Sequence, residues 1–62
     1  MTNTAPPVGT IMRLGELRAK VFVSWPDYLV ARGEHERLHT LRHLDGEWRD
    51  FEGDVWSPEV QP

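Results

Sequence analysis

The dipeptide Asp45-Gly46 lies between two segments that mix apolar and polar residues, 40–44 and 47–51. An Asp-Gly pair in this setting is the strongest short-range signal for a two-residue β-hairpin, because a type I′ turn needs positive φ at both central positions and these two residue types tolerate it best. We therefore predict that the chain folds back here as two antiparallel strands. The predicted pairs are Leu44 with Glu47, His43 with Trp48, Arg42 with Arg49, Leu41 with Asp50 and Thr40 with Phe51.

The segment 34–44 also fits a helix, since it contains good helix formers and its three leucines, Leu38, Leu41 and Leu44, would lie on one arc. Gly46 would then lie just past the helix end. However, Asp45 at a helix C-terminus would oppose the helix dipole. We predict a strand over 37–44 and keep the helix as the alternative.

A second hairpin is predicted at Gly15-Glu16, because Gly at the first central position suits a type II′ turn. This register places Arg13 opposite Arg18. Such like charges cost a little, which screening by the acidic C-terminal part, a nearby acid or an anionic partner relieves. The register also gives the pair of strands one apolar face, as a half-buried hairpin requires. The residues predicted on that face are Met12, Leu14, Leu17, Ala19 and Val21.

Sixty-two residues without cysteine can form one small domain, which has no disulfide to stabilise it and depends on dense aromatic packing, on a partner or on self-association. Further strands are predicted at 28–31, after the break at Trp25-Pro26, and at Val55-Trp56. We predict a mainly β fold over residues 8–56, with four or five short antiparallel strands in a meander or an SH3-like, partly closed barrel. The alternative is an α+β fold with a helix at 34–44. Residues 1–7 and 57–62 are predicted to be extended tails.

Charge is unevenly distributed along the chain. Residues 1–44 hold six basic and four acidic side chains, a net of +2, whereas residues 45–62 hold one basic and six acidic side chains, a net of −5. The basic excess is too small for the usual nucleic-acid footprint. A small nucleic-acid-binding domain that uses Arg13, Arg18 and Lys20 is therefore only an alternative. No run approaches the roughly 20 apolar residues of a membrane span, so we expect no membrane partner and a cytoplasmic location.

The acidic residues after position 44 are interleaved with aromatic ones, a pattern that indicates a surface for a basic protein partner. In such surfaces aromatic side chains supply most of the binding energy and carboxylates speed the encounter. A second aromatic group around Pro26 indicates a groove for an extended peptide. The predicted partner-binding residues are Trp48, Phe51, Trp56, Asp50, Glu52, Asp54, Trp25 and Tyr28.

Catalytic chemistry is not expected. The chain has no thiol, its two serines lack a nucleophile-elbow setting, and no glycine pattern for phosphate binding occurs. We predict no enzyme activity and no cofactor. His35, His39 and His43 recur every four residues, a spacing that can bind zinc or nickel on a helix. No carboxylate completes a known motif, so they are weak candidates and no metal site is predicted.

Pro7-Val8-Gly9-Thr10 at the start of a β-rich chain, followed later by Gly53-Asp54-Val55-Trp56, resembles small accessory proteins encoded by phages of high-GC bacteria. The resemblance implies a non-enzymatic protein that binds another protein. That partner is either a host or defence protein that it inhibits, or the phage particle, as a capsid decoration or head-completion subunit. It also implies a location in the host cytoplasm or in the virion, and we expect that the chain can form a homo-oligomer.

Overall fold

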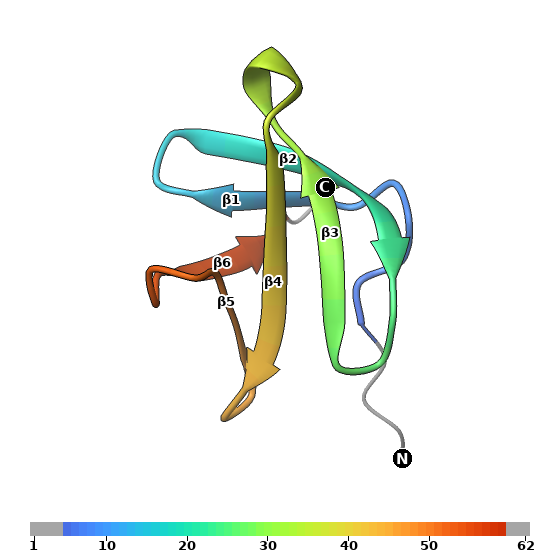
Figure 1. Cartoon of the computed structure of the whole chain (residues 1–62), viewed down its shortest axis with the longest axis vertical. Coiled ribbons are helices and arrows are strands. Elements are labelled where there is room, and N and C mark those ends of the chain that lie inside the picture. Colours follow the sequence, from blue (N-terminus) through green and yellow to red (C-terminus); the bar gives the residue numbers. More distant parts are fainter. Residues whose placement is uncertain (1–4, 60–62) are drawn as a thin grey trace.

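The computed structural model describes residues 5–59, which form six antiparallel strands and one short 3-10 turn (Figure 1). The strands are β1 (Ile11–Leu14), β2 (Leu17–Ser24), β3 (Tyr28–Arg32), β4 (Leu38–Leu44), β5 (Glu47–Arg49) and β6 (Val55–Pro58), and the turn is η1 (Glu34–Glu36). Each strand pairs with the next one, and β6 pairs with β1, so the meander closes into a barrel. The predicted mainly β fold is confirmed, with six strands where four or five were expected. The alternative helix over 34–44 is wrong, because β4 occupies most of that segment.

Both two-residue hairpins have the predicted turn conformation and register. In the β4–β5 turn, Asp45 and Gly46 have φ angles of 52° and 80°, as a type I′ turn requires. The three pairs next to that turn match the prediction and end at Arg42 with Arg49. In the β1–β2 turn, Gly15 has a φ of 60°, and the pairs along that hairpin also follow the predicted register.

The outer part of the β4–β5 hairpin differs from the prediction, because β5 ends at Arg49. The chain turns back immediately afterwards. Asp50 N–H donates to Asp54 O at 3.1 Å, and Gly53 N–H donates to Asp50 O at 3.0 Å, with Gly53 in the left-handed region at a φ of 88°. This five-residue β5–β6 turn, residues 50–54, directs the chain away from β4. The predicted pairs Leu41 with Asp50 and Thr40 with Phe51 therefore do not form.

The core consists of the inward-facing side chains of all six strands, and period-two alternation along each strand explains which residues they are. Leu17 was expected on this inward face, yet half of its side chain is exposed because it lies at the tip of the β1–β2 hairpin. The buried apolar residues are Ala5, Met12, Ala19, Val21, Leu29, Ala31, Leu41, Trp48 and Trp56.

The barrel extends beyond the predicted limits of 8–56. Ala5 is buried, and the Ser24 hydroxyl donates to Pro6 O at 2.7 Å. At the other end, Ser57 and Pro58 belong to β6 and pair with β1. These parts of the predicted tails are therefore parts of the barrel, whereas residues 1–4 and 60–62 of the tails lie outside the described residues.

The cross-strand pair Arg13–Arg18 has an acidic neighbour that relieves the repulsion of its like charges. Glu59 follows β6, and its carboxylate accepts from the Arg18 guanidinium at 2.6 Å and lies 3.6 Å from that of Arg13. The Glu59 side chain is mostly buried, while both arginines are half exposed. One residue of the acidic C-terminal part thus links β6 to the β1–β2 hairpin.

Over residues 5–59 there is no helix of the length and apolarity that a membrane crossing needs.

Candidate functional site

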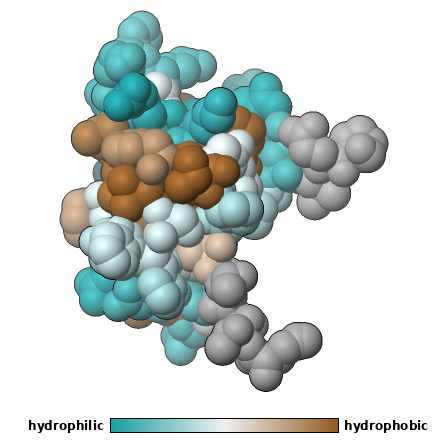
Figure 2. All heavy atoms as spheres, turned by 90° about the vertical axis from the view of Figure 1, so that its right-hand side faces the viewer, coloured by the Kyte–Doolittle hydropathy of each residue, from teal (hydrophilic) through white to brown (hydrophobic). Residues whose placement is uncertain are grey.

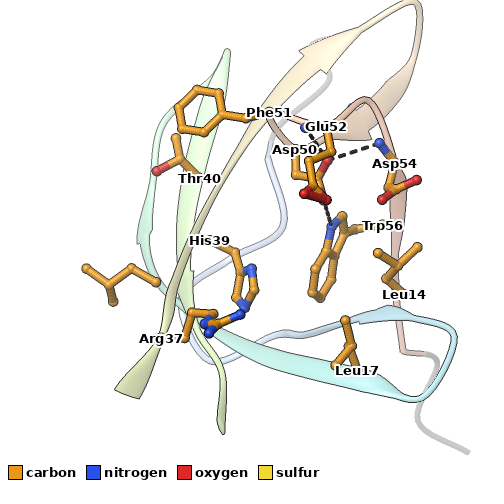
Figure 3. A pocket seen from close by; sticks show the side chains of 11 residues that line it. Leu14, Leu17, Arg37, His39, Thr40, Asp50, Phe51, Glu52, Asp54 and Trp56 are labelled. Carbon is orange, nitrogen blue, oxygen red and sulfur yellow. Dashed lines mark hydrogen bonds between the residues drawn. The ribbon is translucent and has the colours of Figure 1, made fainter. Parts of the chain in front are cut away.

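A pocket of about 350 Å³ opens where the β1–β2 hairpin, the first half of β4 and the β5–β6 turn meet (Figure 3). We call it the seam pocket, because it lies beside the part of β4 that β5 leaves unpaired. The side chains that line it come from segments far apart in the sequence. They are Leu14, Leu17, Arg37, Leu38, His39, Thr40, Asp50, Phe51, Glu52, Asp54 and Trp56.

The floor of the seam pocket is made by Trp56 and His39. The two rings lie 4.8 Å apart between centroids at an interplanar angle of 46°, and Trp56 is only 2% exposed. The indole N–H of Trp56 donates to Oδ2 of Asp50 at 2.9 Å (Figure 3). Buried tryptophan needs such an acceptor for its N–H, and Asp50 supplies it from the β5–β6 turn.

Asp50 is also the residue that organises the β5–β6 turn. Its Oδ1 accepts from the backbone N–H of Glu52 at 2.9 Å and of Asp54 at 3.0 Å. Burial alone would raise the pKa of the Asp50 carboxyl, but the hydrogen bond from Trp56 and those from the backbone of Asp54, Glu52 and Gly53 outweigh it, and the pKa lies below its ordinary value of 3.8. Both carboxylate oxygens are engaged within the protein, so Asp50 shapes the site and is not a free ligand.

The rim of the seam pocket combines apolar side chains with carboxylates. Phe51 is 85% exposed at the tip of the β5–β6 turn, and Leu17 and Leu38 are each at least half exposed on the opposite sides of the opening. Glu52 and Asp54 are exposed on the same turn as Phe51, and no lysine, arginine or histidine within residues 5–59 forms an ion pair with either carboxylate. An uncovered apolar rim beside unpaired negative charge is what a basic protein partner would find complementary.

Five of the predicted partner-binding residues, Phe51, Asp50, Glu52, Asp54 and Trp56, line the seam pocket, the last as part of its floor. The prediction that Trp48 and Trp56 stand on an exposed surface is wrong, since they are 9% and 2% exposed and belong to the core. Trp48 faces Trp56 across β5 and β6, and its ring stacks on His43 at 4.7 Å between centroids. These indoles support the site from within the barrel.

Trp25 and Tyr28 form a separate feature. They flank the β2–β3 turn and stack on each other, with ring centroids 5.9 Å apart and an interplanar angle of 11°. Neither residue lines the seam pocket. A groove around Pro26 for an extended peptide therefore stays a prediction, and the pair is not part of the acidic and aromatic surface.

The three histidines do not gather into one site. His35 lies in η1, with a φ of 58°, while His39 and His43 each lie against an indole. In the part of the chain that the structure describes, no cluster of three or more histidine, aspartate or glutamate side chains has the proximity to hold a metal ion. Two of the three basic residues of the nucleic-acid alternative, Arg13 and Arg18, form ion pairs with Glu59, which reduces the positive charge that they offer a phosphate backbone.

Sequence reasoning missed the side of the pocket that β1, β2 and β4 provide. Along β4 neither face of the segment could be assigned to the core from the sequence, and the structure buries Leu41 while leaving Leu38 exposed. The early end of β5, which uncovers Leu38 and Thr40, was not predicted either. The available signal was Gly53, which marks a second turn only four residues after Arg49 and so limits the length of β5.

Comparison with known proteins adds no relative: no family model, curated protein or solved structure matches this chain. The resemblance to phage accessory proteins stays a prediction.

Proposed function

We propose that this chain is a non-enzymatic protein-binding module that takes a basic protein partner on the rim of the seam pocket. The observation that carries the proposal is Phe51, an aromatic ring that is 85% exposed and flanked by the unpaired carboxylates of Glu52 and Asp54. An exposed aromatic side chain on a rigid turn loses little conformational entropy when a partner covers it, and it is a frequent hot spot of binding energy.

The rigidity of that turn supports the proposal. Asp50 binds two backbone N–H groups of the turn and the Trp56 indole, and the Arg49 guanidinium donates to Gly53 O at 3.0 Å. Phe51 is thus presented by a turn that is fixed to the core at both ends. The role that we propose for the chain is that of a small phage accessory protein. It would inhibit a host or defence protein by covering part of that protein's surface, and this needs no catalytic group.

A second apolar face competes with the seam pocket as the contact surface. Figure 2 shows an apolar band on the side of the barrel that carries β2, β3 and the segment before β1, with hydrophilic surface above it and pale surface of intermediate hydropathy directly below it. The exposed apolar residues of these elements include Val8 and Phe22, and the Arg32 guanidinium lies 5.2 Å from the centre of the Phe22 ring. The exposed carboxylates next to this face that form no ion pair, Asp27 before β3 and Glu34 after it, lie at opposite ends of that strand. Glu52 and Asp54 instead lie together beside Phe51 on one turn, so we assign the basic partner to the seam pocket.

Site-specific photocrosslinking tests the assignment. A benzoylphenylalanine is placed at position 51 or, as the matched exposed control, at position 8, and each protein is irradiated in extract of the cells that carry the natural gene. We expect a discrete adduct with one protein from position 51, and we expect its yield to fall several-fold in a Glu52→Gln, Asp54→Asn double variant or in 0.5 M salt. Equal adducts from both positions, or adducts from position 8 alone, would contradict the proposal.

A further inference from the structure

The backbone of β4 offers an unpaired edge at the seam pocket. In an antiparallel ladder, the backbone groups of successive residues face alternate neighbours. A two-residue hairpin makes Leu44 and Glu47 a hydrogen-bonded pair, so Leu44 and every second residue before it face the β5 side. Those residues are Arg42, Thr40 and Leu38. The alternation is visible in the structure, because His43 N–H donates to Asp27 O at 3.0 Å, on the β3 side.

On the β5 side, the pairing stops at Arg42. Within residues 5–59, no other strand lies against that side of β4, and Leu38 and Thr40 take part in no backbone hydrogen bond beyond the strand ladders. Their N–H and C=O groups therefore face the opening. This is the place where β5 would have continued if the β5–β6 turn had not drawn it away at Asp50.

An unpaired edge of this kind pairs readily with an extended chain. We infer that the partner enters by strand addition, as an extended, lysine- or arginine-bearing segment that pairs with β4 at Leu38 and Thr40 and fills the seam pocket. This inference rests on the proposed function and specifies how the partner is held. Two residues with their backbone groups facing outward provide up to four main-chain hydrogen bonds, and the pocket beside them selects the side chains.

The geometry of the added strand fixes what its residues meet. Side chains of neighbouring strands that lie opposite each other point to the same side, so the residue opposite His39 points inward, toward the floor formed by His39 and Trp56. An apolar side chain suits that position. The β5–β6 turn lies at one end of the added strand, and there Glu52 and Asp54 favour a basic side chain.

Charge and pairing together argue for another protein over a second copy of this chain. Two copies joined at β4 would bring together two chains that each carry a net charge of −3, so they repel one another. A basic segment lowers that repulsion where a second copy would raise it. Gel filtration over a range of concentrations tests the second copy. A dimer that forms in wild type and is lost in Thr40→Pro would show that β4 pairs with β4 of another copy, and it would overturn the inference.

Thr40→Pro is the variant that isolates the edge. Val30 is the β3 partner of Thr40, but the alternation directs the Thr40 N–H away from β3, so proline removes only the donor that faces the opening. His39→Pro is the matched control, because the His39 N–H faces β3 and its loss breaks the ladder. We expect Thr40→Pro to unfold at nearly the wild-type urea concentration and His39→Pro to be strongly destabilised.

Binding is measured with peptides selected on the wild-type protein from a display library of random 12-residue sequences. We expect enriched peptides that carry lysine or arginine beside β-branched residues, with at least tenfold weaker binding to Thr40→Pro. The backbone amides of such a peptide alternate between those that face β4 and those that face solvent. Two peptides are therefore made, one N-methylated at the odd positions and one at the even positions, and only one of them should bind at least tenfold more weakly. In spectra of the complex, the Leu38 and Thr40 amide protons should become protected from exchange.

The two proposals fail differently. Peptides that bind Thr40→Pro as tightly as wild type and tolerate N-methylation at every position, while Phe51→Ala weakens them, would overturn strand addition and leave the protein-binding surface standing. Both proposals would be overturned if the peptides shift the protein's amide signals around Val8 and Phe22 instead of those at the seam pocket. A library that yields no enriched sequences would also overturn both. If Thr40→Pro itself unfolds, the N-methylated peptides decide the inference on the wild-type protein.

Discussion

At the scale of single residues, Asp50 connects the stability of the fold to the shape of the site. Its carboxylate accepts three hydrogen bonds, one from the Trp56 indole and two from backbone N–H groups. Hydrogen bonds to a charged acceptor are stronger than those between neutral groups. Asparagine at this position would keep one oxygen, but its NH₂ group would face an N–H donor. We expect Asp50→Asn to lower the free energy of unfolding at pH 7 by about 1–3 kcal/mol.

The same carboxylate gives the stability a pH dependence with a defined sign. The pKa of Asp50 lies below its ordinary value of 3.8, so the ionised form is favoured by folding. Its contribution is fully present above the unfolded-state pKa and is lost as the pH falls through the folded-state pKa. Urea unfolding followed by tryptophan fluorescence should therefore show a gap between wild type and Asp50→Asn that is large at pH 7 and narrows below pH 3.8. A gap of the same size at both pH values would show that the charge of Asp50 is not involved.

At the scale of elements, the connection between β3 and β4 is strained. η1 holds two residues other than glycine in the left-handed region, His35 at a φ of 58° and Glu36 at a φ of 61°, although left-handed backbone costs about 1–2 kcal/mol for a residue with a Cβ. The turn is closed by Arg37 N–H, which donates to Glu34 O at 3.1 Å, and by Gly33 N–H, which donates to Arg37 O at 2.7 Å. The strain is thus held in place by the strands on either side.

Glycine at position 36 should relieve that strain. We expect Glu36→Gly to raise the free energy of unfolding by about 0.5–1 kcal/mol, because the left-handed backbone costs glycine nothing. The ion pair lost with Glu36 spans 3.9 Å to Arg32 between exposed groups and contributes little. Glu34→Gly is the control, since Glu34 does not have a positive φ and glycine there only adds entropy to the unfolded chain. Thermal unfolding should rank Glu36→Gly above wild type and Glu34→Gly below it, and the reverse order would contradict the strain.

The elements also show what sequence could and could not predict. The β1–β2 and β4–β5 registers were predictable because a two-residue turn fixes the pairing beside it, and the residues that specify each turn are adjacent in the chain. The end of β5 was only partly predictable. Gly53 signals a turn nearby, but the residue at which β5 stops depends on Asp50 reaching the Trp56 indole. The burial of Trp48 and Trp56 was also missed. Alternation puts both indoles on the same face of β5 and β6, but the sequence did not show which face the barrel buries, because that depends on β6 closing onto β1.

At the scale of the whole molecule, stability depends on how the barrel closes between β1 and β6. Glu59 N–H donates to Ile11 O at 2.7 Å, and the pairs after it are Met12 with Pro58 and Arg13 with Ser57. By alternation, the Ser57 pair is hydrogen-bonded and the Pro58 pair is not. This explains why a strand in the middle of a closed sheet can contain a proline, since the missing N–H of Pro58 faces away from β1.

Moving the proline by one residue should therefore open the barrel. A 62-residue domain is expected to have a free energy of unfolding of about 3–9 kcal/mol, and Ser57→Pro removes one of the few hydrogen bonds that close it, at an expected cost of about 2–4 kcal/mol. Pro58→Ser, which adds an N–H on the unpaired side, should change the stability by less than about 1 kcal/mol. Urea unfolding followed by tryptophan fluorescence compares the two, because closure is what buries Trp48 and Trp56. If the two substitutions have equal effects, the hydrogen-bonded pair lies elsewhere and closure does not depend on Ser57. If only Ser57→Pro unfolds the chain, the hydrogen bonds between β1 and β6 keep the barrel closed, although β4 is left unpaired at Leu38 and Thr40 beside the seam pocket.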